Sequence, residues 1–228
     1  MIKKILLLAA LVALSTVLKS QNVKVINDLR SRTTFGVEKE LTKRIAIFGE
    51  VELGMEQNLQ EVGKLHGEAG TSYALFDFLD VDFRYRYTKN RKNYSNEYKY
   101  THTFALAAEA DHKIDRFKLY YRIKYQNIDD EINWFSGDAK TRNVLKNRLK
   151  VSYNIWGSKL EPFISAELYA SMGSGELSAT KLKSIIGIEY KIEAVGDAKI
   201  YYRNDAELTP YFPYRYHTLG LAFTLKLD

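Results

Sequence analysis

The sequence predicts an all-β fold, a transmembrane antiparallel up-and-down β-barrel of 12 strands, with 10 strands as the fallback. Segments of alternating apolar and polar residues recur along the chain, and most are ten or more residues long, whereas strands of soluble proteins typically have five or six. Tyrosine, which favours strands, accounts for 17 of the 228 residues. No segment beyond residue 20 reaches the 18 consecutive apolar residues of a spanning helix.

The N-terminal segment is a predicted signal peptide covering residues 1–20. Lys3 and Lys4 form a basic start, a mainly apolar stretch of 13 residues follows from Ile5 to Val17, and Ser20 is a small residue suited to the position before the cut. Cleavage after Ser20 leaves residues 21–228 as the barrel and lowers the formal net charge from +6 to about +3. The sequence therefore predicts an exported protein of the cell outer membrane, with no nucleic-acid partner.

Eleven later segments are predicted strands because their apolar residues recur with a period of two. In chain order they are about 32–42, 44–56, 64–75, 78–88, 98–112, 115–127, 142–155, 159–171, 180–193, 197–206 and 214–227. The alternation is clearest in the last of them, where Leu219, Leu221 and Phe223 are separated by Gly220 and Ala222. Comparable apolar sets mark earlier strands: Ile45, Ile47, Val51 and Leu53; Leu79, Val81, Phe83 and Tyr85; Phe117, Leu119, Tyr121 and Ile123; Leu149, Val151, Tyr153 and Ile155.

The connections alternate in length, as in a series of hairpins. Short ones centre near Lys43, Asp77, Asp115, Gly157 and Gly196, and longer polar ones lie at 57–63, 89–97, 128–141, 172–179 and 207–213. Tight turns at the periplasmic rim and longer loops outside are typical of outer-membrane barrels. Because such barrels have an even number of strands, a further strand is expected before residue 32, in the segment 22–28.

The polar face of these strands carries charges of both signs. This face is predicted to line the lumen with a network of ion pairs formed by Glu50, Glu52, Glu68, Asp82, Arg84, Arg86, Glu109, Arg122, Lys124, Arg148, Lys150, Glu167, Glu189 and Arg203. Tyrosines gather where strands meet the long loops and predict an aromatic girdle at one membrane interface: Tyr85, Tyr87, Tyr98, Tyr100, Tyr125, Tyr202, Tyr214 and Tyr216. Alternation alone also fits a soluble periplasmic lipid-binding barrel with its apolar face inside.

Several strand motifs resemble those of domain-of-unknown-function family 2490 (DUF2490). The residues that carry the resemblance are 84–87 (Arg-Tyr-Arg-Tyr), 121–126, Arg142 with 146–150, 162–167, 201–203 and 217–221. The likeness extends from about Phe35 to the end of the chain. It implies a Bacteroidetes-type outer-membrane β-barrel, and it brings neither an activity nor catalytic residues.

A search for catalytic chemistry gives no convincing site, so the protein is not expected to be an enzyme. His66, Glu68 and Ser72 share the polar face, His102 falls on the outward face, where Ser95 is one available hydroxyl, and His217 is placed on the lumen face. No metal site and no cofactor are expected. The function indicated is a structural or interaction barrel or a narrow channel for small solutes, with outer-membrane lipid, a small solute or an extracellular ligand at the loops as partners. An outer-membrane lipid-modifying enzyme is the further alternative.

Overall fold

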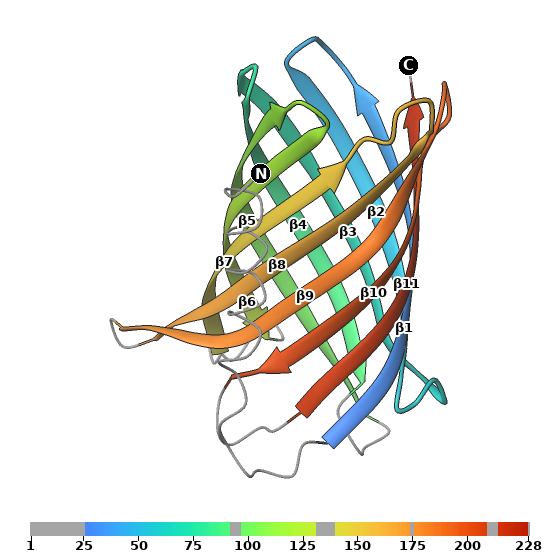
Figure 1. The fold of residues 1–228 in the computed structure, drawn as a ribbon. Coiled ribbons are helices and arrows are strands. Elements are labelled where there is room, and N and C mark those ends of the chain that lie inside the picture. Colours follow the sequence, from blue (N-terminus) through green and yellow to red (C-terminus); the bar gives the residue numbers. More distant parts are fainter. Residues whose placement is uncertain (1–25, 92–96, 131–139, 174–175, 209–213, 228) are drawn as a thin grey trace.

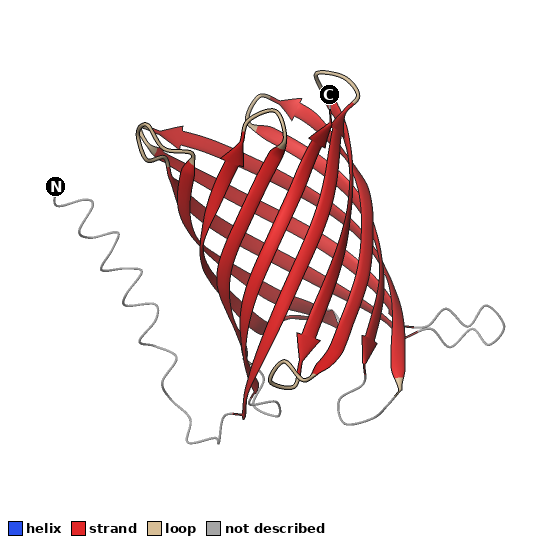
Figure 2. Cartoon of the chain, turned by 90° about the vertical axis from the view of Figure 1, so that its right-hand side faces the viewer, coloured by secondary structure: helices blue, strands red, loops and turns tan. Residues whose placement is uncertain are grey.

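The computed structural model describes residues 26–91, 97–130, 140–173, 176–208 and 214–227, and these residues form one closed β-barrel (Figure 1). The fold class predicted from the sequence is confirmed. Its strands are β1 (Ile26–Glu40), β2 (Ile45–Glu56), β3 (Glu61–Phe76), β4 (Leu79–Arg91), β5 (Tyr98–Ile114), β6 (Phe117–Asp130), β7 (Lys140–Tyr153), β8 (Leu160–Gly173), β9 (Glu176–Ile192), β10 (Gly196–Glu207) and β11 (Tyr214–Leu227). All are strongly tilted relative to the barrel axis (Figure 2). No helix in the described part of the chain is long and apolar enough to cross a membrane.

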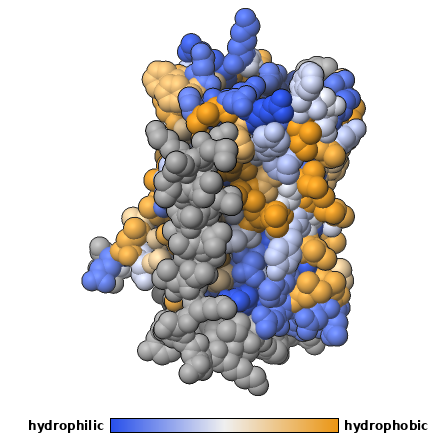
Figure 3. Space-filling model, viewed as in Figure 1, coloured by the Kyte–Doolittle hydropathy of each residue, from blue (hydrophilic) through white to orange (hydrophobic). Residues whose placement is uncertain are grey.

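The barrel is polar inside and apolar outside. On β4, for example, Asp82 is 3% exposed and its neighbour Phe83 is 52% exposed. The same alternation runs along the other strands because successive side chains of a strand point to opposite faces of the sheet. Hydrophobic side chains therefore cover much of the outer surface, and hydrophilic ones gather at the upper rim (Figure 3).

The described residues contain eleven strands, one fewer than the twelve expected and one more than the fallback of ten. Residues 26–31 extend β1 and do not form a strand of their own, while residues 22–25 lie outside the described range. The barrel closes by pairing β1 with β11 in parallel, over fourteen residue pairs from Ile26–Tyr214 to Lys39–Leu227. Every other neighbouring pair is antiparallel. An odd strand number requires one such parallel contact, because the first and last strands then run in the same direction.

The connections define two rims. At the turn rim, residues 41–44, 77–78, 115–116, 154–159 and 193–195 join β1 to β2, β3 to β4, β5 to β6, β7 to β8 and β9 to β10. The remaining connections and the start of β1 define the loop rim. Two connections there, 57–60 and 174–175, are shorter than expected because β3 and β9 begin three to four residues earlier than the sequence indicated.

Large side chains on the inner wall lie flat against glycines of the next strand. Phe48 of β2 packs over Gly70 of β3, where an added Cβ would lie 2.5 Å from the ring. Phe163 of β8 packs over Gly187 of β9 in the same way, at 2.8 Å. A ring that covers a glycine fills the gap in the wall and stabilises the strand pair. Such rings therefore run along the wall and do not project across the lumen.

Candidate functional site

A polar cavity of about 470 Å³ occupies the lumen and is lined by residues from all eleven strands of the described barrel. Eleven lysine and arginine side chains and five carboxylates line it, together with His66, Tyr169 and Tyr216. The cavity is thus charged throughout, with a clear excess of positive charge. The lumen is accordingly the candidate functional site.

The wall formed by β1, β2 and β3 is closed by short ion pairs. Arg32 of β1 donates from Nη2 to Oε1 of Glu56 on β2, at 2.6 Å, and Lys64 of β3 lies 3.1 Å from Oε1 of Glu52. His66 lies 3.4 Å from both Glu50 and Glu52. Glu52 and Glu56 therefore already have cationic partners within the wall.

A second set of ion pairs runs laterally from β3 to β8. Glu68 accepts from Arg84 at 3.3 Å, and Arg84, which also pairs with Asp82, donates to Glu109 at 3.1 Å. Arg122 lies 3.5 Å from Glu109 and reaches past β7 to Glu167 on β8, at 2.9 Å. Each of these carboxylates is buried. A buried carboxylate needs such partners, because its transfer from water is otherwise costly.

The remaining wall carries shorter pairings. Lys150 of β7 donates to Glu189 of β9 at 2.9 Å, and Lys199 of β10 lies 3.7 Å from the same carboxylate. Arg203 lies 3.0 Å from Asp205 on its own strand. The ion pairs thus follow the circumference of the barrel, and the paired residues lie on the same or nearby strands.

All fourteen charged residues expected in the lumen lie on the inward face of their strands. Sequence reasoning did not single out several others that lie with them: Arg30, Arg32, Glu56, Lys64, Arg142, Lys146, Lys181, Lys183 and Asp205. The period of two was sufficient to find Lys146 and Lys183, since they share the parity of Arg148 and Glu189. Arg30 was missed because the first strand was expected to begin only at residue 32, and Arg32 is the first residue of that expected strand.

The tyrosines expected to form a girdle divide between the two faces. Tyr87, Tyr98, Tyr100, Tyr125 and Tyr202 are exposed on the outside, and the rings of Tyr87 and Tyr100 stack with centroids 6.1 Å apart. Tyr85 also lies outside, where its hydroxyl is 2.7 Å from Nδ1 of His102.

Tyr214 and Tyr216 do not belong to this outer set. Tyr216 lines the cavity with the guanidinium of Arg30 3.6 Å from its ring centroid, and the ring of Tyr214 stacks on that of Tyr216. His217 was expected in the lumen and instead lies outside, with Nδ1 2.5 Å from the hydroxyl of Tyr202. Leu219 and Leu221 of β11 point outward. His217 lies two residues before Leu219 and so points outward too, whereas Tyr216 has the opposite parity and points into the lumen.

The structure does not bring His66 together with Ser72, the hydroxyl that was expected to share its face. His66 contacts only carboxylates through its ring nitrogens, and Ser72 lies six residues further along the same strand, about 20 Å away. Ser95 falls outside the described residues. No three histidine, aspartate or glutamate side chains within the described part are grouped so that they could hold a metal ion.

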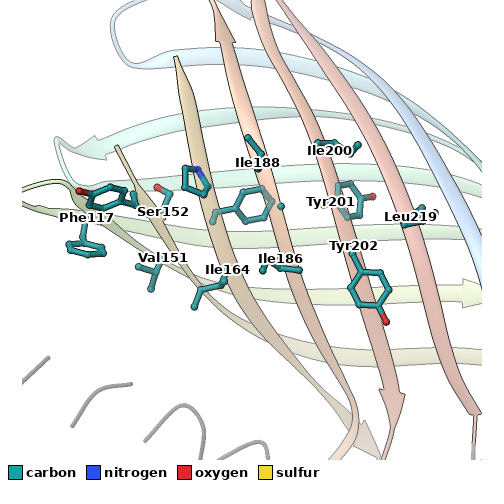
Figure 4. Close-up of a pocket in the computed structure, with 14 residues that line it drawn as sticks. Phe117, Val151, Ser152, Ile164, Ile186, Ile188, Ile200, Tyr201, Tyr202 and Leu219 are labelled. Carbon is teal, nitrogen blue, oxygen red and sulfur yellow. The ribbon is translucent and has the colours of Figure 1, made fainter. Parts of the chain in front are cut away.

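A second hollow, of about 640 Å³, lies on the outer wall over β6 to β11 (Figure 4). Its lining is almost wholly apolar and includes Ile164, Ile186, Ile188, Ile200 and Leu219. The close-up shows these side chains on neighbouring strands. The hollow offers no hydrogen-bonding chemistry comparable to that of the lumen.

Comparisons with known proteins identify a family. The model of a family described as "Protein of unknown function (DUF2490)" matches residues 33–210. No curated protein matches the chain. Among solved structures, the beta domain of the Bordetella autotransporter BrkA is similar over 71% of this chain and 75% of that chain, with 10% identity and a TM-score of 0.49.

Two further solved structures are similar. The translocator domain of the autotransporter NalP from Neisseria meningitidis is matched over 73% of this chain and 71% of that chain, at 13% identity and a TM-score of 0.47. The NanC porin is matched over 78% and 86%, at 14% identity and a TM-score of 0.46.

Proposed function

Because the chain belongs to the DUF2490 family, which is described without an activity, we propose from the barrel itself that this protein is an outer-membrane β-barrel with a narrow passage for small solutes. The inverted polarity of the barrel carries the proposal. Charged side chains such as Glu68, Asp82 and Lys124 are buried inside, and large apolar side chains cover the outside. Soluble monomers rarely expose contiguous apolar surface of more than a few hundred Å².

Closure of the sheet supports the same location. In lipid every backbone group must be hydrogen-bonded within the protein, so a sheet can cross a bilayer only when it has no free edge. The parallel pairing of β1 with β11 removes the edges that these two strands would otherwise expose. A signal peptide at residues 1–20 with cleavage after Ser20 accounts for export, and the turn rim then faces the periplasm.

The passage is supported by the size and filling of the lumen. Eleven strands exceed the eight at which side chains can fill a barrel, and fall short of the 16 or more of wide porins. Phe48 and Phe163 lie flat on glycines, which leaves the middle of the barrel to water and charged groups. Outer-membrane lipid is the partner of the outer wall, and the proposal assigns no catalytic role.

The test begins with the mature chain folded into detergent micelles. We expect β-type circular dichroism, and a band that migrates differently in gel electrophoresis with and without boiling. Planar bilayers should then show discrete single-channel conductance. A protein that stays monomeric and soluble without detergent, and shows no heat-dependent shift, would refute the membrane assignment.

A closed scaffold is the second candidate, and the lateral ion pairs through Arg84 and Arg122 favour it. In a scaffold these pairs serve stability alone. Arg122→Gln would remove one cationic partner from each of the buried carboxylates Glu109 and Glu167. The change should lower the free energy of unfolding by about 2–4 kcal/mol. In a passage the same change should also alter ion selectivity. Lys118→Gln, which breaks the half-exposed pair with Asp111, is the matched control and should change stability by about 0.5 kcal/mol or less.

A further inference from the structure

The inner wall of β6 and β7 carries two consecutive pairs of like charges. In the antiparallel register Arg122 lies directly opposite Arg148, and Lys124 lies directly opposite Lys146. Like charges at directly opposed positions of a sheet destabilise the strand pair. Arg122 is compensated by ion pairs with Glu109 and Glu167. Lys124, Lys146 and Arg148 are the three like charges that remain to be compensated.

Few carboxylates are available to compensate these three residues. Together with Lys183 of β9 they form a cluster that we call the basic wall: Lys124, Lys146, Arg148 and Lys183. Among the described residues, no carboxylate oxygen lies within 4 Å of a charged nitrogen of these four side chains. Lys124 is only 4% exposed, and Nε of Arg148 is buried without a hydrogen-bond partner.

Tyr169 of β8 holds two of the ammonium groups beside each other. Nζ of Lys146 lies 4.2 Å from the centroid of its ring, and Nζ of Lys183 lies 4.7 Å from it. Two buried carboxylates lie opposite the cluster in the register. Glu167 of β8, opposite both Arg148 and Lys183, is hydrogen-bonded to Arg122, and Asp205 of β10, opposite Lys183, lies 3.0 Å from Arg203. Three ammonium groups and a guanidinium therefore share two carboxylates, each of which is already engaged by an arginine.

The basic wall can be reached through the cavity. Lys124, Lys146 and Lys183 line the 470 Å³ cavity. Lys146 and Tyr169 also line a smaller cavity of about 420 Å³, whose lining includes Arg142 and Thr180 nearer the loop rim. A small solute that enters from the loop rim would thus meet the cluster.

We infer that the basic wall is a binding site for a small solute that carries a phosphate group or another multiply charged oxyanion. Such a ligand supplies the missing negative charge and relieves the repulsion between Lys124 and Lys146. The ammonium groups of Lys124, Lys146 and Lys183, which line the cavity, can donate charge-assisted hydrogen bonds to the oxygens of such an oxyanion. The inference extends the proposed function to a class of solute. Binding requires that the solute reach the lumen from one rim only, so it does not require conduction through the barrel.

The test uses inorganic phosphate as the probe and the folded barrel in a zwitterionic detergent at low ionic strength. We expect saturable binding in isothermal titration calorimetry. Each lost charge-assisted contact should weaken binding about tenfold, so the double variant Lys124→Gln/Lys146→Gln should bind about a hundredfold more weakly. Lys150→Gln is the matched control, because Lys150 lies on the same face of β7 and is paired with Glu189. It should change the affinity by about twofold or less. Citrate in place of phosphate distinguishes a multiply charged carboxylate ligand from a phosphate ligand.

Stability separates binding from a purely structural role. Without phosphate, Lys146→Gln should raise the unfolding midpoint, since it removes a repulsive pair; a fall would mean that Lys146 is part of the structural network. The inference is overturned if the wild-type barrel binds neither phosphate nor citrate, or if the double variant binds as tightly as the wild type. Phosphate binding without bilayer conductance would refute the proposed passage but not the binding site. Bilayer conductance without phosphate binding would refute the binding site but not the passage.

Discussion

At the scale of single residues, the inner wall is shaped by the contact of rings with glycines. Gly187 lies under Phe163, and an ideal Cβ there would come within 2.6 Å of the carbonyl oxygen of Ile200 and 2.8 Å of the ring. Gly67 lies on the outer face of β3 and has no atom within 4 Å of the same position. The two glycines therefore have different physical reasons to be present, although both occur inside strands.

Gly187→Val should destabilise the barrel by about 2–3 kcal/mol, because the backbone of β10 and the ring of Phe163 must both shift. The measurement is the unfolding midpoint in urea, followed by the heat-dependent gel shift. Gly67→Val is the control, and should be neutral or slightly stabilising, since valine favours strands. Equal losses for the two variants would argue against the packing of Phe163 on Gly187.

At the scale of elements, the β1–β11 seam decides the strand number. Phe35 of β1 and Phe223 of β11 stack across the seam on the outside, with ring centroids 5.9 Å apart. On the inside, Gly36 is directly opposite Thr224. A strand inserted between β1 and β11 would separate these positions by about 9–10 Å, twice the spacing of adjacent strands.

The variant Gly36→Cys/Thr224→Cys should form a disulfide on mild oxidation. A Cβ at Gly36 would lie 3.4 Å from Oγ1 of Thr224, so the two thiols can meet, and the chain has no other cysteine to compete. Gel mobility with and without reductant measures the bond. Gly36→Cys/Thr218→Cys is the control, with the second cysteine six residues, about 20 Å, along β11. Failure of the first pair to cross-link would favour a barrel with a further strand.

At the scale of the whole molecule, charge is distributed unevenly within the lumen. Carboxylates concentrate on the wall of β2 to β5, where cations neutralise them. The wall of β6 to β9 carries Lys124, Lys146 and Lys183, the lysines that have no carboxylate within 4 Å among the described residues. The cavity as a whole has eleven lysines and arginines against five carboxylates. A low-dielectric wall focuses such a potential into the lumen.

Single channels in a potassium chloride gradient should accordingly be anion-selective. The reversal potential measures the preference, which should decrease as ionic strength rises, because the Debye length falls from about 10 Å at 0.1 M salt to about 3 Å at 1 M. Lys124→Glu should reduce or reverse the selectivity. A wild-type channel that prefers cations would contradict the assigned charge balance.

Much of the fold was predictable because its signal is local. A period of two in apolar residues depends only on neighbouring positions, so all eleven strands were located from it, with shifts of up to six residues at their ends, the largest at the start of β1. The inward placement of Arg84, Arg122 and Glu167 follows from the same parity. The faces of Tyr216 and His217 were predicted wrongly. Both residues lie near a strand end, where polar residues occur on both faces and the apolar pattern no longer indicates the parity.

The sequence by itself determined the class of the fold, the faces of the strands and the presence of charges of both signs in the lumen, since each is set by residue type and strand parity. Only the tertiary structure decided how the sheet closes and which charges meet. The parallel β1–β11 seam joins residues almost 190 positions apart, such as Ile26 and Tyr214. The register across β6 and β7 sets Lys124 opposite Lys146, and a shift of one residue would have put either side chain on the other face. Such pairings depend on long-range register, which no local pattern in the chain records.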